Sequence, residues 1–201
     1  VKAVDQVTAI ELDRNMVQLL EPLRHSSPGL RILEQNALET DPRSLAQDRP
    51  YKLVANLPYY IASAVIRQFL ETDFPPTLMV IMVQKEVAER ICAGPGDMSV
   101  LSVSVRAFAE PDIVRVVPSA AFYPPPKVDS ALLRLRVLQA PVIAPARQRR
   151  FFRLVRAGFQ DRRKQIHNAL ARNLGSNQRV VDAILSEADI EASRRAETLS
   201  M

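Results

Sequence analysis

The segment Asn56-Leu57-Pro58-Tyr59 has residue types and spacing suited to chemistry on a flat, polar substrate. Pro58 stiffens the turn and has no N–H group, so the Asn56 amide and the carbonyl oxygens of Leu57 and Pro58 can project into a crevice. With the Tyr59 ring beside them, these groups fit an aromatic ring that carries an amino group, because oxygens accept from the amino hydrogens while the rings stack. An ordinary proline turn with a core tyrosine is the alternative, and this segment alone does not decide between them.

Basic side chains gather in one block of the sequence. Residues 134–179 hold 12 Lys and Arg and 1 acidic residue, whereas residues 1–133 and 180–201 are mildly acidic, and the whole chain has a net charge of +5. Because only Asp161 interrupts the block, it indicates a surface for a polyanion such as nucleic acid. A solvated helix face is the plainer alternative. A membrane surface is less suitable, because the block lacks Trp and its three phenylalanines fit a core stripe.

Composition excludes several other kinds of site. The 201 residues are 47% hydrophobic and 24% charged, as in globular proteins. The five glycines form neither a G-x-G-x-x-G nor a P-loop pattern, so no glycine-rich nucleotide cradle is visible. Cys92 is the only cysteine, and His25 and His167 lack ligand spacing, so we expect no disulfide within the chain and no metal site. No apolar run is long enough to span a bilayer and no leader is visible, so we expect a cytoplasmic protein without a membrane partner.

Alternating patterns predict the elements that position these residues. Four strands are predicted, at residues 7–12, 30–33, 51–55 and 78–83. Four helices are predicted, one beginning after Asp13 as N-cap and the others at residues 61–70, 84–92 and 99–109. Strands that alternate with helices imply a mostly parallel sheet. Asn56 then lies at the carboxyl end of a strand, where open α/β sheets bind ligands.

The remaining sequence changes character. Residues 113–117 and 128–137 are predicted as an antiparallel edge pair, because the connecting residues 118–126 are too rich in proline for either a helix or a strand. After a linker-like stretch near residues 138–146, only helical patterns follow, at residues 148–159, 164–174 and 179–187. The sequence therefore predicts an α/β domain over residues 1–140 and a small all-helical domain over residues 146–201.

Several segments together resemble the small-subunit ribosomal RNA adenine dimethyltransferases of the KsgA type. Asn-Leu-Pro-Tyr is similar to the motif of methyltransferases that act on amino groups of adenine, and Pro118 to Ser130, PSAAFYPPPKVDS, is the most specific match. Further matches follow in order at Ala9 to Asp13, Gln35 to Leu38, Gln84 to Arg90, Leu101 to Val103 and Gly158 to Lys164. The resemblance extends from about residue 7 to Leu199 and implies a Rossmann-like methyltransferase sheet followed by a helical domain.

The resemblance also implies an activity and its catalytic residues. Asn56 and the backbone carbonyl of Leu57 or Pro58 would accept hydrogen bonds from the adenine amino group. Tyr59 and Phe122 would lie on the two faces of the adenine ring. The implied reaction transfers methyl groups from S-adenosylmethionine to the 6-amino groups of two adjacent adenines in small-subunit rRNA. The implied partner is the immature 30S-type subunit during ribosome assembly, and a monomer is expected.

Cofactor and RNA contacts follow from the same resemblance. Glu11 would hold the ribose of S-adenosylmethionine, and Asn36 and Ala37 would contact its adenine, with Asn56 also beside the cofactor. Asn36 stands where the family usually has Asp, so a charge-assisted contact is lost. The family's glycine-rich cofactor loop is absent, and we expect it upstream of Val1. The expected RNA contacts are Lys127, Arg147, Arg150, Arg162, Arg163 and Lys164.

Two alternatives stay open at this point. A large-subunit rRNA adenine methyltransferase that confers macrolide resistance has a similar Asn-Leu-Pro-Tyr, but the run from Phe122 to Ser130 favours the small-subunit enzyme. The other is a non-catalytic RNA-binding protein or mitochondrial transcription factor on the same fold. Retention of Asn56 and Tyr59 argues against this second alternative, whereas the absent glycine loop leaves it open.

Overall fold

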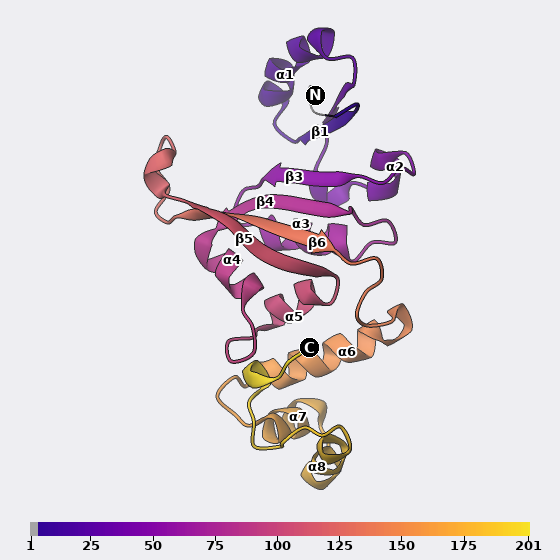
Figure 1. The fold of residues 1–201 in the computed structure, drawn as a ribbon, viewed down its shortest axis with the longest axis vertical. Coiled ribbons are helices and arrows are strands. Elements are labelled where there is room, and N and C mark those ends of the chain that lie inside the picture. Colours follow the sequence, from indigo (N-terminus) through magenta and orange to yellow (C-terminus); the bar gives the residue numbers. More distant parts are fainter. Residues whose placement is uncertain (1–3) are drawn as a thin grey trace.

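The strands form two sheets in a computed structural model that describes residues 4–201 (Figure 1). β1 (Val7–Glu11) and β2 (Leu30–Glu34) make a parallel pair, and the other sheet has the order β3-β4-β6-β5. Its strands are β3 (Lys52–Asn56), β4 (Leu78–Gln84), β5 (Ala109–Val117) and β6 (Ser130–Val137). Within the described residues no strand joins the two sheets. The single sheet expected from the sequence is therefore present as two separate sheets, β1-β2 and β3-β4-β6-β5.

Strand direction follows the prediction closely. β3 and β4 are parallel, and β6 is antiparallel to both of its neighbours, β4 and β5. Three strands of the larger sheet therefore run in one direction and β6 alone runs in the other. The predicted antiparallel pair is confirmed, with β5 at the edge and β6 inside the sheet. An edge position explains how β5 tolerates Pro111, which has no N–H for a ladder.

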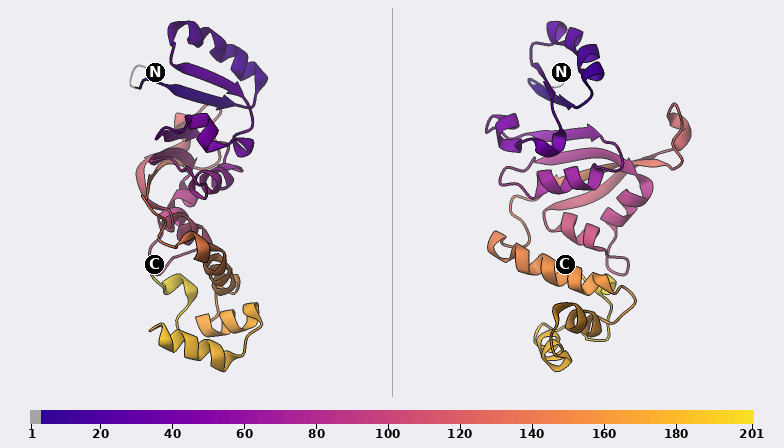
Figure 2. Two further views of the ribbon diagram at one scale, coloured as in Figure 1. Left: turned by 90° about the vertical axis from the view of Figure 1, so that its right-hand side faces the viewer. Right: turned by 180° about the vertical axis from the view of Figure 1, so that it is seen from behind.

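Helices cover one face of the larger sheet. Figure 2 shows α3 (Ala62–Leu70), α4 (Lys85–Cys92) and α5 (Val100–Arg106) on the same side of it. The apolar run of β4 supplies the core, because Met79, Ile81 and Val83 are fully buried while the intervening residues are half-buried. The helix predicted to reach residue 109 ends at Arg106, and β5 begins at Ala109 rather than at residue 113. β-branched residues in both segments concealed this boundary.

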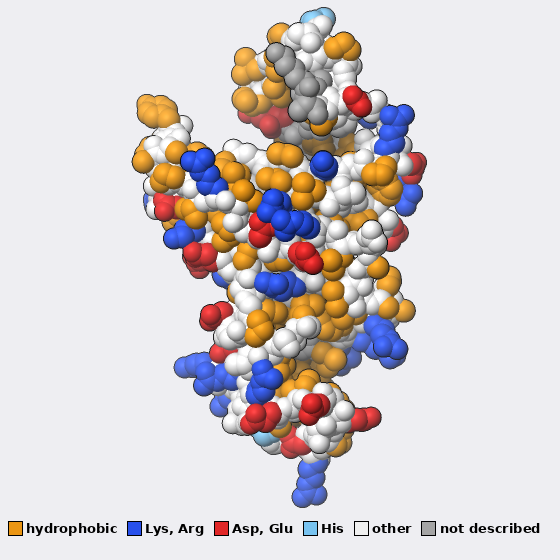
Figure 3. Space-filling view, viewed as in Figure 1, with side chains coloured by type: hydrophobic (Ala, Val, Ile, Leu, Met, Phe, Trp, Pro, Cys, Tyr) orange, Lys and Arg blue, Asp and Glu red, His pale blue; other side chains and the backbone are white. Residues whose placement is uncertain are grey.

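Charged side chains pair across strands β5 and β6 of the larger sheet. Arg134 forms two hydrogen bonds with Asp112 across the β5–β6 pair, and Arg136 adds a third at 3.0 Å. The hydrogen bond from Arg134, with the charges of both arginines, holds the pKa of Asp112 below its ordinary value. Figure 3 shows basic and acidic side chains together on the face that carries the sheet.

Short helices and one longer helix follow the first strands of the chain. α1 (Arg14–Ser26) begins as predicted, because the Asp13 carboxylate accepts a hydrogen bond from the Asn15 N–H at 2.8 Å. The segment after β2 contains a short 3-10 helix, η1 (Ala37–Glu39), and the one-turn helix α2 (Pro42–Ala46). A second 3-10 helix, η2 (Ser119–Ala121), lies in the β5–β6 connection.

The chain ends in helices, as predicted, and no strand follows them up to Met201. They are α6 (Pro145–Gln160), α7 (Ile166–Leu174) and α8 (Gln178–Glu187), followed by the 3-10 helix η3 (Ala196–Thr198). α6 contributes to two hydrophobic clusters, because Phe152 packs against the α/β core and Phe159 packs against the helical cluster. The carbonyl of Glu197 accepts hydrogen bonds from the Gly96 and Met98 N–H groups. The helical part is therefore fixed to the α/β part at two places.

Candidate active site

The catalytic segments predicted from the sequence meet at one edge of the larger sheet. Asn56 ends β3 in register with Met82 near the end of β4, and Ser130 pairs with both Gln84 and Val117. The carboxyl ends of β3, β4 and β5 thus lie at the same edge. The β5–β6 connection, residues 118–129, projects from this edge (Figure 1). The hairpin that carries Phe122 is consequently at the same end of the sheet as Asn56.

Hydrogen bonds distinguish the two candidate carbonyls of the turn. The Pro58 carbonyl accepts from the Ile61 N–H at 3.1 Å, which leads the chain into α3. Among residues 4–201 the Leu57 carbonyl and the Asn56 side chain have no hydrogen-bond partner, and Asn56 is exposed. The side-chain oxygen of Asn56 and the backbone oxygen of the next residue, Leu57, are therefore available to a ligand. The Pro58 carbonyl thus already accepts one hydrogen bond, whereas the Leu57 carbonyl accepts none among the described residues.

Tyr59 is anchored on the adjacent strand. Its hydroxyl lies 2.7 Å from the hydroxyl of Ser130, the first residue of β6, and the two residues are 71 positions apart. Ser130 is fully buried and Tyr59 is half-buried. The sequence analysis included Ser130 in its most specific match but gave it no role, because a contact between such distant segments leaves no local pattern.

The Phe122 hairpin is also held in place. The Asp129 side chain accepts from the Ser119 N–H at 2.9 Å, and the Asp129 carbonyl accepts from the Lys85 N–H at 3.0 Å. Phe122 itself is half-buried, and its N–H bonds the Ser119 carbonyl. The second of these contacts ties the hairpin to the start of α4. It lies at the edge of the sheet where β3, β4 and β5 have their carboxyl ends, called the reaction edge below.

Glu11 and Asn36 both lie where parallel strands end, since β1 and β2 are in register from Val7 and Leu30 onward. One Glu11 oxygen, Oε1, accepts from the N–H groups of Leu12 and Asp13, at 2.8 and 2.9 Å. This fixes the carboxylate and leaves Oε2 without a partner among the described residues. The ends of β1 and β2 thus present an oriented acceptor.

Asn36 has a local role that the sequence could have revealed. Its Oδ1 accepts from the Leu38 N–H at 3.0 Å, and its Nδ2 donates to Glu39 at 2.9 Å. Asn36 thus serves as the N-cap of η1, and Asn is among the residue types preferred at that position. The Ala37 N–H, in contrast, donates to no group within residues 4–201.

Gln68 connects this loop to α3 and was also missed by sequence reasoning. Its Nε2 donates to the Ala37 carbonyl at 3.1 Å and to the Thr40 carbonyl at 3.0 Å. Thr40 is almost fully buried, so its carbonyl has little access to water. Gln68 therefore braces the loop that follows β2 against the helix that follows the catalytic turn.

The predicted RNA-contacting residues lie in separate places. Arg147 and Arg150 are exposed on α6 and form no ion pair with any described residue, whereas Arg162 lies 4.0 Å from Glu197. Arg163 is exposed. Lys127 lines a hollow of about 380 Å³ beside Lys85, at the base of the Phe122 hairpin.

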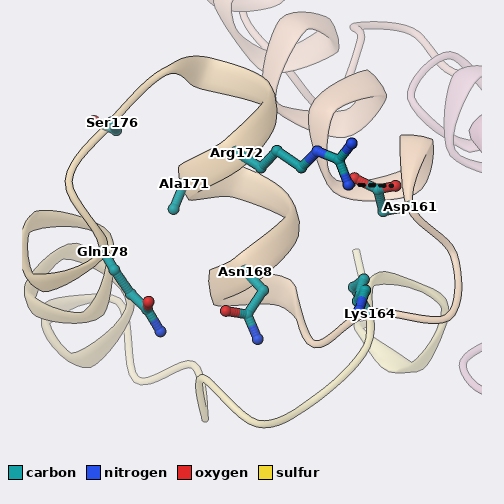
Figure 4. Close-up of a pocket in the computed structure, with 7 residues that line it drawn as sticks. All are labelled: Asp161, Lys164, Asn168, Ala171, Arg172, Ser176 and Gln178. Carbon is teal, nitrogen blue, oxygen red and sulfur yellow. Dashed lines mark ion pairs between the residues drawn. The ribbon is translucent and has the colours of Figure 1, made fainter.

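Lys164 lines a second hollow, of about 510 Å³, in the helical part. Figure 4 shows it with Asn168 and Arg172, and with Asp161 paired to Arg172 at 3.8 Å. The positive charges are thus spread along the molecule rather than gathered in one cluster.

Comparison with known proteins identifies the family, because the model described as ribosomal RNA adenine dimethylase matches residues 1–201. The chain belongs to the ribosomal RNA adenine dimethylase family. A ribosomal RNA small subunit methyltransferase A of Dehalococcoides mccartyi is 51% identical, and the match covers 100% of this chain and 69% of the relative. Its counterpart in Clostridioides difficile is 39% identical, covering 100% and 71%. This dimethylase-family chain is an rRNA adenine methyltransferase, as the sequence motifs predicted.

Solved structures confirm the Rossmann-like methyltransferase fold. A 23S rRNA methyltransferase, ErmE, has a TM-score of 0.72 at 28% identity, covering 96% of this chain and 78% of its own. A dimethyladenosine transferase from Plasmodium falciparum has a TM-score of 0.79 at 23% identity, covering 97% and 78%. Within residues 4–201 no helix is long and apolar enough to cross a membrane.

The family and fold imply S-adenosylmethionine as the methyl donor. The residues at the ends of β1 and β2 fit its nucleoside part. The free Glu11 oxygen is a suitable acceptor for ribose hydroxyls, and the free Ala37 N–H is a donor for a ring nitrogen. The Asn36 side chain supports this loop through one hydrogen bond at each polar atom, and each atom can make one more.

Proposed function

We propose that this protein transfers methyl groups from S-adenosylmethionine to the 6-amino groups of two adjacent adenines in small-subunit rRNA, on an immature 30S-type subunit. The observation that carries the proposal is the pair of unpartnered acceptors, the Asn56 amide oxygen and the Leu57 carbonyl, at the sheet edge beside Tyr59. The 51% identity to a relative named as a small-subunit methyltransferase supports the choice of subunit.

The two acceptors address the chemical difficulty of the reaction. The lone pair of the adenine amino nitrogen is delocalised into the ring, so this nitrogen is a poor nucleophile. Asn56 and Leu57 each accept a hydrogen bond from one of its two N–H groups. These hydrogen bonds favour a more tetrahedral nitrogen, whose lone pair is then available to attack the methyl group. S-adenosylmethionine, when bound, supplies a methyl group on an activated sulfonium. The protein contributes mainly position and fixed dipoles, since the donor needs no further activation.

Base recognition is assigned to the aromatic residues of the same edge. Tyr59 and Phe122 stack on the two faces of the adenine, which must leave its helix to reach them. Glu11 and Ala37 hold the cofactor's ribose and adenine. Both sites lie at carboxyl ends of strands, as ligand sites in open α/β sheets do.

RNA binding is assigned to the helical domain, residues 146–201, and to Lys127. The exposed arginines of α6 include Arg149, Arg153 and Arg156, which recur at helical spacing and form no ion pair within the described chain. Arg147, Arg150, Arg162 and Arg163 extend this basic surface, and Lys164 adds a charge in its hollow. Such contacts neutralise phosphates and fix the orientation of the RNA without reading its sequence.

Labelled methyl transfer tests the proposal directly. The protein expressed from its whole gene is incubated with labelled S-adenosylmethionine and small subunits from cells that lack the enzyme, and dimethylated adenosine is measured after nuclease digestion. We expect Asn56→Ala to lower kcat by roughly 100-fold or more, because it removes one of two fixed acceptors. Gln18→Ala, which shortens an exposed amide on α1, should retain activity.

The competing functions give different results in the same experiment. Transfer to large-subunit RNA instead of small subunits would overturn the proposed substrate in favour of the ErmE-like activity. RNA binding without transfer to either subunit would indicate a non-catalytic protein. Undiminished transfer by Asn56→Ala would remove the catalytic role assigned to the Asn56 turn.

A further inference from the structure

Ser130 occupies an unusually constrained position for a serine near a reaction edge. It is fully buried, and it pairs with Gln84 of β4 on one side and with Val117 of β5 on the other. Its backbone is therefore held from both neighbouring strands. A buried hydroxyl without a partner would destabilise the fold. The partner that the structure provides across the edge is the Tyr59 hydroxyl, at 2.7 Å.

This hydrogen bond engages the tip of the Tyr59 ring and leaves its faces free. The place of a tyrosine ring depends on χ1, and a hydrogen bond at the far oxygen restricts χ1, whereas rotation about χ2 leaves that oxygen where it is. The backbone segment of Tyr59 is a turn, so it fixes the ring less firmly than a strand would. The strand residue Ser130 thus gives the Tyr59 ring a second attachment besides its own turn.

Ser130 also closes the hairpin that carries Phe122. The hairpin leaves the sheet at Val117 and returns at Ser130, and these two residues are paired. One residue therefore connects the turn that holds Tyr59 with the loop that holds Phe122. The distance between the two aromatic side chains depends on this connection.

We propose that Ser130 is a positioning residue for the target base. It fixes the hydroxyl end of the Tyr59 ring and so keeps the ring at the place where adenine stacks, at the base of the Phe122 hairpin. The inference rests on the proposed function for its substrate, but the contact that carries it is independent of the comparisons. Ser130 contacts neither substrate nor cofactor in this account, and it acts through Tyr59.

Three variants test the contact. Ser130→Ala and Tyr59→Phe each remove one hydroxyl and keep the remaining shape of the side chain. We expect each to lower kcat by roughly tenfold, the loss of one neutral hydrogen bond, with little change in the KM for S-adenosylmethionine. The double variant should be no slower than either single one, because both substitutions remove the same contact.

Ser102→Ala is the matched control. Ser102 is also a fully buried serine, and its hydroxyl caps α5 by accepting from the Ser99 N–H at 2.7 Å. Both serine variants should lower the urea midpoint of unfolding to a similar extent. Only Ser130→Ala should lower kcat, which separates a positioning role from a merely structural one.

A measurement that needs no activity completes the test. The Hα–Hβ couplings of Tyr59, which report χ1, should indicate one rotamer (an ordered ring position) in the wild type and rotamer averaging in Ser130→Ala, with no change in Ser102→Ala. If Ser130→Ala loses stability but keeps kcat and ring order, the proposal is overturned. If the wild type methylates no RNA, the proposed function fails, and the ring order still decides whether Ser130 orients Tyr59.

Discussion

The brace formed by Gln68 makes a quantitative prediction about cofactor affinity. Gln68→Met keeps the length of the side chain and removes both hydrogen bonds to the carbonyls of Ala37 and Thr40. The Ala37 carbonyl still accepts from the Thr40 hydroxyl at 2.8 Å, whereas no other donor reaches the Thr40 carbonyl within residues 4–201. The loop that presents the Ala37 N–H should therefore become less ordered.

The size of the effect follows from the two lost contacts. A neutral hydrogen bond contributes about 1 kcal/mol net, so the loop loses about 2 kcal/mol of local stability. At about 1.4 kcal/mol per tenfold, this sets an upper limit of roughly 30-fold on the loss of affinity for the nucleoside. Because Gln68 donates to the loop after β2 and to none of the residues assigned to the target base, kcat at saturating cofactor should stay within about twofold.

Calorimetric titration with S-adenosylhomocysteine measures this effect on the protein expressed from its whole gene. Arg67→Met on the same helix is the control, since Arg67 only forms an exposed ion pair with Glu71 at 2.9 Å, and such pairs contribute little. We expect Gln68→Met to bind roughly 3- to 30-fold more weakly, which corresponds to one to two lost hydrogen bonds. Arg67→Met should bind with the affinity of the wild type. Equal affinities, together with a lower unfolding midpoint for Gln68→Met alone, would refute the reasoning.

Three further predictions concern RNA binding, pH and packing. Replacing Arg149, Arg153 and Arg156 by Gln should reduce the slope of log K for RNA against log salt by about 2 to 3, and an unchanged slope in anisotropy titrations would contradict their phosphate role. The lowered pKa of Asp112 means that its stabilising effect is complete above about pH 5 and disappears as pH falls through the lowered value. The difference in urea stability between wild type and Asp112→Asn should therefore shrink in acid, and a constant difference would count against the ion pairs. A Cβ at Gly29 would overlap the Asp5 carbonyl oxygen, so Gly29→Ala should lose about 1 to 3 kcal/mol and hydrogen-exchange protection in β1 and β2, whereas Gly94→Ala, with open space around it, should not.

Local patterns accounted for most of the elements. The apolar run at 78–83 and the N-cap at Asp13 predicted β4 and the start of α1, because burial and capping act over a few residues. The boundary between α5 and β5 was predicted wrongly. There, the outcome depends on pairing with β6, whose partner residues are more than twenty positions away. The separation of β1 and β2 from the larger sheet likewise depends on strand pairing that no local window contains.

The candidate site shows the same division. The motif predicted Asn56 and the carbonyls of Leu57 and Pro58 as the groups that face the target base, and the structure adds that the Pro58 carbonyl already accepts one hydrogen bond, from the Ile61 N–H. Residues that act by holding others, Ser130 and Gln68, were given no role, since their partners are 71 and about 30 positions away. Asn36 was predicted to contact the cofactor, and the structure adds a local role as the N-cap of η1, which the sequence analysis did not mention.

The reversed direction of β6 has a consequence for how this enzyme class can diversify. A parallel return would need a crossover of a dozen or more residues ending at the opposite border of the sheet. The reversal instead lets residues 118–129 emerge and re-enter beside the reacting atoms, with both ends clamped at Val117 and Ser130. Insertions or substitutions in such a clamped excursion can alter which RNA is admitted without disturbing the strands beneath it. We therefore expect substrate preference to vary through this excursion while the sheet stays constant.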